Sequence, residues 1–344
     1  MNYRIAVLGA GSWGTALAYL LAKKGYQVTL WARNINQCEA IKRTKENRKY
    51  LPGVFLPPKL KVCHDLSKDL AGHHMIVMAV PSHSVREVAK EISSYIDSET
   101  IIVNTAKGFE PESFIRLSNV LEEELAQIPV QNITVLSGPS HAEEVGRNLP
   151  TAVVVATRDK KVGETVQDAF MTTDFRVYLN YDIIGVELAG ALKNVIALGT
   201  GVSDGLGYGD NTKAALITRG LAEITRLGTA LGAEEQTFSG LAGLGDLVVT
   251  CTSMHSRNRR AGIQIGQGQS ISQVLANMGM VVEGINTTRA AYHLARKNNV
   301  VMPITEQMYQ VLFEGKDPQE AVVSLMSRSK THEREREMLG DGQN

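Results

Sequence analysis

The sequence predicts an α/β protein with a doubly wound parallel sheet in its N-terminal part and a mostly α-helical C-terminal domain. Short apolar runs alternate with amphipathic stretches through the first half, as in a parallel sheet with helices on both faces. After about Asp182 strand-like runs almost disappear. We therefore expect a sheet domain over residues 1–181, a helical domain over residues 182–330, and a charged, disordered tail over residues 331–344.

The first half contains the elements of the expected sheet. Buried strands are predicted at Arg4–Leu8, Gln27–Trp31, Met75–Val80, Thr100–Asn104, Ile133–Leu136 and Ala152–Ala156. Helices are predicted at Ser12–Lys24, from about Asn36, and at Ser84–Ser94. The first helix ends before Gly25, which is a common stop signal.

The second half is predicted to consist of helices joined by glycine-rich loops. The helices are expected at Ile183–Leu198, Lys213–Leu231, Ser270–Met278, Thr287–Asn298 and Thr305–Phe313. The run from Gly199 to Gly209 is rich in glycine, which disfavours the interior of a helix, and is therefore predicted to be a loop.

Composition and charge restrict the class of function. The 344 residues are 43% hydrophobic and 21% charged, and 36 basic side chains balance 36 acidic ones. Such a chain has no positive field to gather nucleic acid or an anionic membrane, although a local cluster can still bind a small anion. The three cysteines lie far apart without a C-x-x-C pair, which indicates a reducing cytoplasm rather than disulfides.

His73 and His74 lack an H-E-x-x-H context, so we expect a strand-edge pair and no metal.

The N-terminus imitates a signal peptide, because Arg4 precedes an apolar stretch and Ala16-Leu17-Ala18 resembles a cleavage site. Glycines and Ser12 interrupt the apolar run, and cleavage would remove the first strand of the unit that follows. We therefore reject secretion. No other stretch approaches about 20 uninterrupted apolar residues, so no membrane insertion is expected.

The sequence GAGSWG over residues 9–14 matches the G-x-G-x-x-G fingerprint of dinucleotide-binding, Rossmann-like domains. It lies between a predicted strand and a predicted helix, which is the context that gives the pattern meaning. Gly9 allows the tight turn, Gly11 lets the backbone approach a pyrophosphate, and Gly14 lets helix and strand pack closely. The free N–H groups at the helix N-terminus then favour phosphate. The alternative is a tight turn without a ligand.

The end of the second strand bears on the choice of cofactor. An acidic residue there would bind the ribose 2′-hydroxyl of NAD, but this chain has Arg33. An arginine suits a 2′-phosphate, so NADP(H) is favoured and NAD(H) tolerated. Basic residues between positions 42 and 49 either add to this positive field or form a solvated helix face.

Lys193 is the strongest candidate for acid–base chemistry. It lies in a helix that is apolar on nearly every side, and burial lowers an ammonium pKa toward the range useful for proton transfer. Gly190, one turn earlier, leaves room for a ligand. The alternative is a lysine that extends along the helix to reach solvent.

Other polar segments could complete a site. Residues 256–260, SRNRR, combine cations with neutral donors and suit a phosphate, although an exposed basic loop is the alternative. Asp246 either pairs with Lys193 or caps a helix. The segments 104–108 and 137–140 follow predicted strands at the carboxyl edge, where open α/β sheets bind ligands.

Taken together, these segments resemble bacterial NAD(P)-dependent glycerol-3-phosphate dehydrogenase from about residue 3 to Arg328. The resemblance rests on several motifs in order, namely GAGSWGTALA, TAKG, LSGPS, GVELAGALKNVIA, LAGLGDLVVTCTS, SRNRR and VVEG. It departs at His141, where the family usually has an aromatic residue after GPS, and we expect that change to affect only local packing.

The resemblance implies roles for individual residues, with Lys193 as the proton acceptor. The implied cofactor contacts, besides the fingerprint glycines, are Ser12, Trp13, Arg33, Lys107, Ala142, Arg257, Val281 and Glu283. The implied substrate contacts are Lys107, Gly138, Ser140, Lys193, Asp246, Ser256, Arg257 and Asn258.

The implied reaction is the reversible reduction of dihydroxyacetone phosphate to sn-glycerol-3-phosphate, which supplies glycerophospholipid synthesis in the cytoplasm. The implied partner is thus a small phosphorylated substrate, and a homodimer is left open. Two other hypotheses are a β-hydroxyacid or phosphogluconate-type dehydrogenase, which shares this general plan, and a non-catalytic NADP(H) sensor, which would have no need of a buried Lys193.

Overall fold

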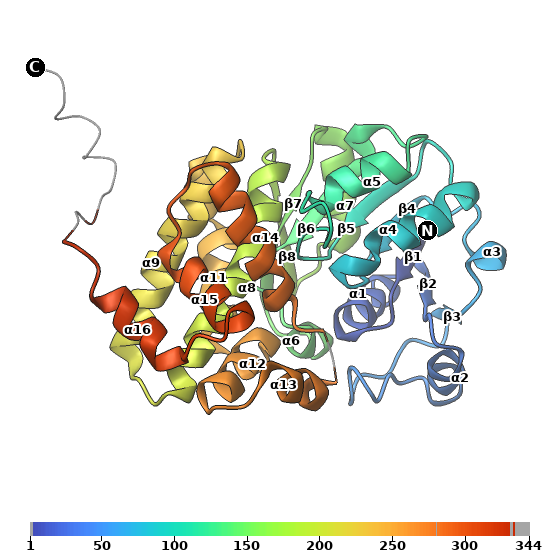
Figure 1. Ribbon diagram of the computed structural model, residues 1–344. Coiled ribbons are helices and arrows are strands. Elements are labelled where there is room, and N and C mark those ends of the chain that lie inside the picture. The colour runs from blue at the N-terminus through green and yellow to red at the C-terminus, as the bar shows by residue number, and fades with distance from the viewer. Residues whose placement is uncertain (1–2, 280, 331–332, 334–344) are drawn as a thin grey trace, which may run out of the picture.

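The computed structural model describes residues 3–279, 281–330 and 333, and it confirms the predicted fold class (Figure 1). One sheet has the strand order β3-β2-β1-β4-β5-β6-β7-β8. Its strands are β1 (Arg4–Leu8), β2 (Gln27–Trp31), β3 (Lys61–Cys63), β4 (Met75–Met78), β5 (Ile101–Asn104), β6 (Ile133–Ser137), β7 (Thr151–Ala156) and β8 (Phe175–Asn180). Neighbouring strands are parallel except β6 and β7, so the last two strands run opposite to the first six.

Helices cover both faces of the sheet. Successive strand residues point to opposite faces, and here both sets are apolar and need to be buried. Ile5 and Val7 share a buried cluster with α1, α2 and α7, whereas Ala6 and Leu8 share one with α3, α4 and α5. The helices of this half are α1 (Ser12–Lys23), α2 (Ile35–Thr44), α3 (Leu66–Asp69), α4 (Val85–Ile92), α5 (Leu117–Glu124), α6 (Ala142–Gly146) and α7 (Lys160–Phe170). Short 3-10 turns are η1 (Ser82–Ser84), η2 (Ser93–Tyr95) and η3 (Val130–Asn132).

The rest of the chain is helical, as predicted, and lies beside the sheet in Figure 1. Its helices are α8 (Ile183–Gly205), α9 (Asp210–Ala230), α10 (Glu235–Phe238), α11 (Asp246–Thr252), α12 (Arg257–Gly266), α13 (Ile271–Met278), α14 (Glu283–Lys297), α15 (Pro303–Phe313) and α16 (Pro318–Met326). A π-helical turn, η4 (Leu241–Gly245), precedes α11. The expected limits of the two domains stay a prediction, and most of the predicted tail over residues 331–344 lies outside the described residues.

The glycine-rich run after Leu198 is not a loop as predicted, because α8 continues through it to Gly205. The reason is close packing of α8 against α12. A Cβ atom on Gly201 would lie 2.2 Å from the carbonyl oxygen of Arg259, and one on Gly262 would lie 2.1 Å from that of Leu198. These glycines let two helix backbones touch, and the burial gained there outweighs the low helix propensity of glycine.

Two strands were missed, β3 and β8, and their sequences show why. The first has only three residues, and in β8 the alternation of buried and exposed residues lasts for four residues and gives way to the half-buried Leu179 and Asn180. His73 is buried, with its ring nitrogens 2.8 Å from the carbonyl oxygen of Leu70 and 3.1 Å from Oγ1 of Thr29. His73 and His74 directly precede β4, and Nδ1 of His74 accepts a hydrogen bond from the backbone N–H of Arg4 in β1.

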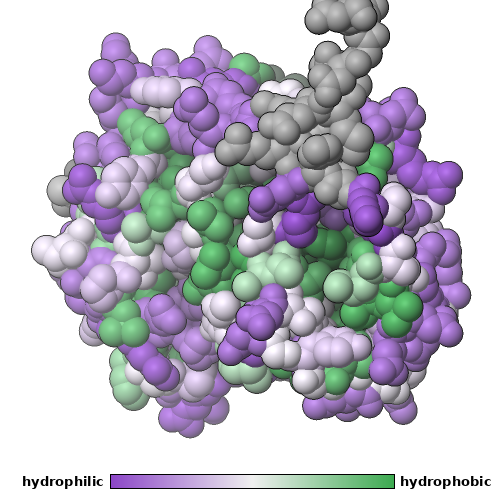
Figure 2. Space-filling model, turned by 90° about the vertical axis from the view of Figure 1, so that its left-hand side faces the viewer, coloured by the Kyte–Doolittle hydropathy of each residue, from purple (hydrophilic) through white to green (hydrophobic). Residues whose placement is uncertain are grey.

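In the part of the chain that the structure describes, one helix, α8, is long and apolar enough to cross a membrane, judged by its length and composition alone. The most apolar stretch of this helix is 89% buried inside the protein, as expected for a helix of the hydrophobic core. Figure 2 views the side of the molecule formed by the helical half, where apolar side chains gather across the middle of the face. Exposed apolar side chains of this half include Val301, Val323 and Met326.

We predict that Gly262→Ala destabilises the protein, because its new Cβ would overlap the backbone of α8. Overpacking of a tight core typically costs about 1–3 kcal/mol, and a contact with backbone cannot be relieved by side-chain rotation. Thermal unfolding followed by circular dichroism would measure the effect. Gly209→Ala is the matched control, since a Cβ there meets nothing within 4 Å. Equal melting temperatures for both variants would contradict the packing argument.

Candidate active site

The candidate site lies at the carboxyl edge of the sheet, where the loops after β1, β4, β5 and β6 come together. The register aligns Leu8 with Met78, Met78 with Asn104, and Asn104 with Val135, so these four strands end side by side. The α8 helix packs against β6 at this edge and brings its own side chains to the same place. The sheet thus presents one half of the site and the helical half presents the other.

The loop after β1 fits the pyrophosphate of a dinucleotide. A Cβ on Gly9 would lie 2.5 Å from the carbonyl oxygen of Ala79, and one on Gly14 would lie 1.9 Å from that of Gly9. A Cβ on Gly11, by contrast, would meet nothing within 4 Å. Gly11 is the N-cap residue of α1 and supplies no side-chain cap, and the first turn of the helix carries no acidic residue. Free N–H groups, a positive helix end and open space beside Gly11 are what a phosphate group requires.

The carboxylate of Asp246 is shared by two lysines from different parts of the chain. Its Oδ1 atom lies 2.5 Å from Nζ of Lys193 in α8, and its Oδ2 atom lies 2.6 Å from Nζ of Lys107 in the loop after β5. Lys193 also donates to Oγ1 of Thr250 at 2.6 Å. The side chain of Lys193 is 7% exposed, so it does not extend to solvent. The predicted pairing of Asp246 with Lys193 is therefore what the structure contains.

The surroundings lower the pKa of both partners in this pair, for different reasons. Burial lowers the pKa of Lys193 to about 8, Asp246 opposes this shift, and the charge of Lys107 adds to it. Burial alone would raise the pKa of Asp246, but the two ammonium groups outweigh it, so its pKa lies below the ordinary value. The result is a permanent carboxylate beside an amine that can exchange a proton near neutral pH.

The LAGLGD motif places Asp246 by an unusual helical turn. The π turn η4 runs directly into α11, and Gly245 between them has helical angles of φ −59° and ψ −50°. A Cβ on Gly243 would lie 2.0 Å from the carbonyl oxygen of Phe238, so a glycine is required there. Asp246 accordingly sits inside a continuous helical segment rather than at a cap. Such π turns occur often at functional sites.

In the SRNRR segment, some side chains are bonded within the fold, whereas others are available to bind a ligand. Ser256 caps α12 by accepting from the N–H of Arg259, and Asn258 is buried between Oδ1 of Asn194 and the N–H of Gly284. The guanidinium of Arg259 pairs with Asp204 at 2.7 Å and is committed to the fold. Arg257 is an exposed residue that forms no ion pair or hydrogen bond with the described residues, and the carboxylates whose charges reach it are those of Glu283 and Glu143.

Glu283 reaches from the helical half across to the sheet half. It begins α14, and its carboxylate accepts from the N–H and the hydroxyl of Ser82 at 3.1 Å and 2.6 Å. Val281, the other predicted contact in this motif, is half-buried just before α14. Ser82 was not among the predicted site residues. Its position in the loop that follows the carboxyl end of β4 is the signal that would have identified it.

Arg33 lies at the end of β2 as the cofactor prediction requires, but it already has a partner. Its guanidinium is 2.6 Å from Glu87 of α4, and both side chains are more than half exposed. Ser12 donates to the carbonyl oxygen of Tyr50 at 2.6 Å, and Trp13 is half-buried against the core in the first turn of α1. The basic residues at positions 42 and 43 belong to an exposed face of α2, as the alternative proposed.

The loop after β6 approaches Lys107 through backbone groups. The carbonyl oxygen of Gly138 accepts from Nζ of Lys107 at 3.2 Å and from Oγ of Ser140 at 2.9 Å. Ala142 begins α6 and is buried. The predicted opening beside Gly190 is wrong, because a Cβ there would lie 2.9 Å from Oγ of Ser137. The space beside Gly190 is filled by the side chains of Ser137 and Lys107.

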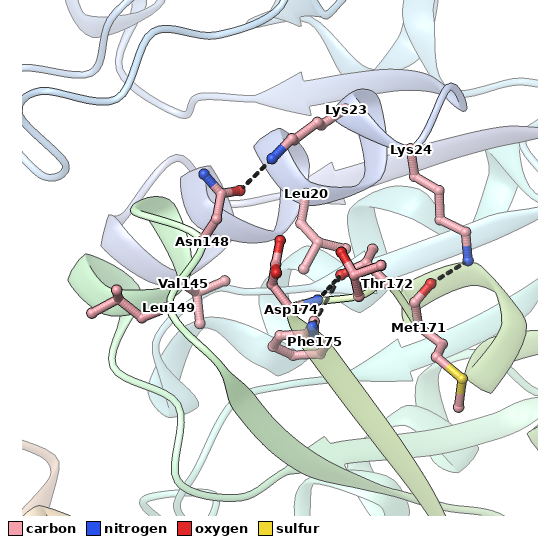
Figure 3. A pocket seen from close by; sticks show the side chains of 11 residues that line it. Leu20, Lys23, Lys24, Val145, Asn148, Leu149, Met171, Thr172, Asp174 and Phe175 are labelled. Carbon is pink, nitrogen blue, oxygen red and sulfur yellow. Dashed lines mark hydrogen bonds between the residues drawn. The ribbon is translucent and has the colours of Figure 1, made fainter.

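A separate cavity of about 310 Å³ lies away from these residues, between the end of α1 and the start of β8 (Figure 3). Nζ of Lys23 donates to Asn148 at 2.8 Å, and Nζ of Lys24 donates to the carbonyl oxygen of Met171 at 2.6 Å. None of the predicted site residues lines it. No group of three potential metal-binding His, Cys, Asp or Glu side chains occurs among the residues described.

The fold and site together define a nicotinamide-dependent dehydrogenase, with a dinucleotide-binding sheet facing a helical half that carries a buried lysine–carboxylate pair. The NAD-dependent glycerol-3-phosphate dehydrogenase family matches in both its parts, its N-terminus over residues 4–163 and its C-terminus over residues 182–323.

Individual relatives agree with this match. The chain is 58% identical over 335 residues to glycerol-3-phosphate dehydrogenase (NAD(P)+) of Pelotomaculum thermopropionicum, covering 97% of this chain and 96% of that protein. It is 52% identical to the Bacillus subtilis protein of the same name, covering 96% of both chains. The crystal structure of glycerol-3-phosphate dehydrogenase from Coxiella burnetii has a TM-score of 0.91 and 43% identity, covering 95% of this chain and 99% of that one.

This chain therefore belongs to the NAD-dependent glycerol-3-phosphate dehydrogenase family, and the resemblance inferred from its motifs is confirmed. It is an NAD(P)-dependent oxidoreductase, which sets aside the hypothesis of a non-catalytic sensor.

We predict that Asp246→Asn shifts the pH dependence of carbonyl reduction to lower pH. The variant removes the negative charge that holds up the pKa of Lys193, so the ammonium is lost at a lower pH than in the wild type. The measurement is the pH profile of kcat/KM for NADPH-dependent reduction. Asp210→Asn, at a fully exposed carboxylate, is the control. A profile that coincides with that of the wild type would refute the coupling.

Proposed function

We propose that this chain catalyses reversible hydride transfer between NAD(P)H and dihydroxyacetone phosphate, with Lys193 as the acid–base group. The observation that carries the proposal is the buried ammonium of Lys193, held by Asp246 at the edge of the sheet where the dinucleotide loop opens. Its side chain is 7% exposed, so proton exchange with bulk water does not compete easily with exchange to a bound substrate. The sheet half and the helical half must both contribute for such a site to exist.

The proton chemistry follows from the lowered pKa of Lys193. A nicotinamide bound at the Gly9–Gly14 loop would supply or accept the hydride. In reduction, the Lys193 ammonium donates a proton to the carbonyl oxygen, and in the reverse reaction the neutral amine removes the hydroxyl proton. With a pKa of about 8, Lys193 is mostly protonated at neutral pH and is increasingly neutral above it. Reduction is thus favoured below this pH and oxidation above it.

Charged groups would orient the substrate around Lys193. Arg257 is an exposed cation that forms no hydrogen bond or ion pair with the described residues, and it suits the substrate phosphate. The carboxylates whose charges reach it are those of Glu283 and Glu143. Lys107 and Asp246 fix the amine of Lys193, while Gly138 and Ser140 border the same space. Holding the phosphate away from the reacting carbon lets binding supply the orientation of the reaction.

We predict that Lys193→Ala retains NADPH binding but lowers kcat by about 10²–10⁴-fold, the usual contribution of a positioned acid or base. Asp246 keeps Lys107 as its partner in this variant, so the carboxylate is not left alone. Stopped-flow reduction of dihydroxyacetone phosphate and a fluorescence titration with NADPH would separate the two effects. Lys193→Met is a second variant of similar length. A nearly unchanged kcat in both variants would remove Lys193 from the mechanism.

The choice between NADP and NAD is proposed to depend on Arg33, with NADP(H) favoured. We predict that Arg33→Ala raises KM for NADPH about tenfold while changing KM for NADH little, because charge-assisted hydrogen bonds are the stronger ones. Glu87→Gln should act in the opposite direction, since it releases Arg33 from an exposed pair that itself contributes little to stability. If neither variant changes the ratio of the two KM values, Arg33 does not select the cofactor.

Activity assays decide the substrate class. Oxidation of NADPH, and separately of NADH, would be followed with dihydroxyacetone phosphate, and the reverse reaction with sn-glycerol-3-phosphate beside a 3-hydroxy acid. Turnover of the phosphorylated substrate alone supports the proposal, and preference for the 3-hydroxy acid would favour the β-hydroxyacid alternative. The product would supply glycerophospholipid synthesis in the cytoplasm. A homodimer is still a hypothesis, which sedimentation of the purified chain would test.

A further inference from the structure

The ring of His141 carries a nitrogen atom for which the protein supplies no partner. Its Nε2 atom is buried and makes no hydrogen bond within the described residues. The other buried side-chain polar atoms in this situation are the hydroxyls of Ser137, Ser203 and Thr287 and Nε of Arg260. A hydroxyl can rotate toward another acceptor and a guanidinium has further donors, whereas an imidazole nitrogen points in one fixed direction. An unpaired buried polar atom of this kind calls for an explanation, and a ligand is one.

The position of His141 indicates which ligand. It lies between Ser140 and Ala142, directly before α6, and its backbone carbonyl accepts from the first turn of that helix. Its ring centroid is 5.5 Å from that of His255, which precedes the segment that starts at Ser256. The ring is also close enough to Lys193 and Asp246 to feel both of their charges. His141 therefore lies near both the acid–base pair and the start of α12.

The charge state of His141 further restricts which chemical group of a ligand Nε2 would bind. Burial and then the charge of Lys193 lower its pKa below the ordinary value, against the weaker opposing effects of Glu143 and Asp246. The ring is consequently neutral near pH 7. A neutral imidazole nitrogen suits a hydroxyl group, whereas a phosphate prefers a cation such as the guanidinium of Arg257.

We propose that Nε2 of His141 forms a hydrogen bond with the primary hydroxyl of the substrate, at the end opposite the phosphate. With Lys193 serving the reacting oxygen and Arg257 the phosphate, this hydroxyl is the end of dihydroxyacetone phosphate that neither of these two groups binds. His141 is then a specificity-determining residue rather than the packing residue that the sequence suggested. This inference rests on the proposed function.

The test compares two substrates that differ only in this hydroxyl. They are dihydroxyacetone phosphate and the phosphate ester of hydroxyacetone, and the readout is the ratio of their kcat/KM values. Because both substrates carry the same phosphate and carbonyl, other effects of a substitution cancel in the ratio. We expect His141→Phe to lower the ratio about three- to tenfold, the usual range for one neutral hydrogen bond. His141→Gln, which can place an amide near Nε2, should preserve most of it.

A matched control and a stability measurement separate this role from a structural one. His293→Phe makes the same substitution at an exposed histidine of α14 that stacks on Phe114 with ring centroids 5.4 Å apart, and it should leave the ratio unchanged. Without ligand, His141→Phe should melt at the same temperature as the wild type or higher, because it removes a buried unpaired nitrogen.

The outcomes are distinct. A reduced ratio in His141→Phe with retained stability supports the hydrogen bond. An unchanged ratio, with or without a loss of stability, overturns it. Failure of the wild type to reduce dihydroxyacetone phosphate would instead overturn the proposed function itself.

Discussion

The carboxylate of Asp246, bound at once by Lys193 and Lys107, is the interaction that makes the site a single unit. Lys107 follows a strand of the sheet, while Lys193 and Asp246 belong to two helices of the other half. Three buried or half-buried charges are costly one by one, and each is acceptable only because the others are present. One negative charge between two positive ones leaves a net positive charge at the edge of the sheet. That sign suits an anionic substrate and keeps the amine of Lys193 ready to lose a proton.

The rest of the fold holds α8 firmly enough for this geometry to persist. Glycine-lined contact with α12 fixes its second half, and its first half is tied to the sheet side by Glu187, which is buried and bonded to Arg116 and Ser118 at 2.9 Å and 2.5 Å. Asn258 links α8 to the start of α14, which in turn carries Glu283 across to Ser82. A lysine in the middle of such a helix has little freedom to move. Rigid support of this kind is what a pre-organised proton donor needs.

Groups that the fold uses can be distinguished from groups that it leaves available. Arg259 has a carboxylate partner and Asn258 bonds through both ends of its amide, so both serve the structure first. Among the described residues, Arg257 forms no hydrogen bond or ion pair and Nε2 of His141 has no hydrogen-bond partner. The space beside Gly11 is open. The available groups lie on both halves of the protein, as a substrate and cofactor bound between the halves would require.

Local sequence determined the elements whose signals are local. The strand–glycine–helix unit at the N-terminus, the order of strands and helices, and the buried helix containing Lys193 all follow from short-range periodicity and turn residues. The family could also be identified from the sequence alone, because each of its motifs is a contiguous segment of the chain. The short β3 and the partly polar β8 gave too weak a period to be predicted.

Tertiary structure decided everything that depends on segments distant in sequence. Only the contact with α12 turns the glycine-rich run after Leu198 into helix, since the backbone of a partner about 60 residues away in the sequence supplies the compensating packing. The choice between pairing and capping for Asp246, the partner of Arg33 and the crossing from Glu283 to Ser82 likewise could not be deduced, because each joins residues that no local pattern relates. Propensity acts over a few residues, whereas burial and charge pairing act through space, and the site is made by the latter.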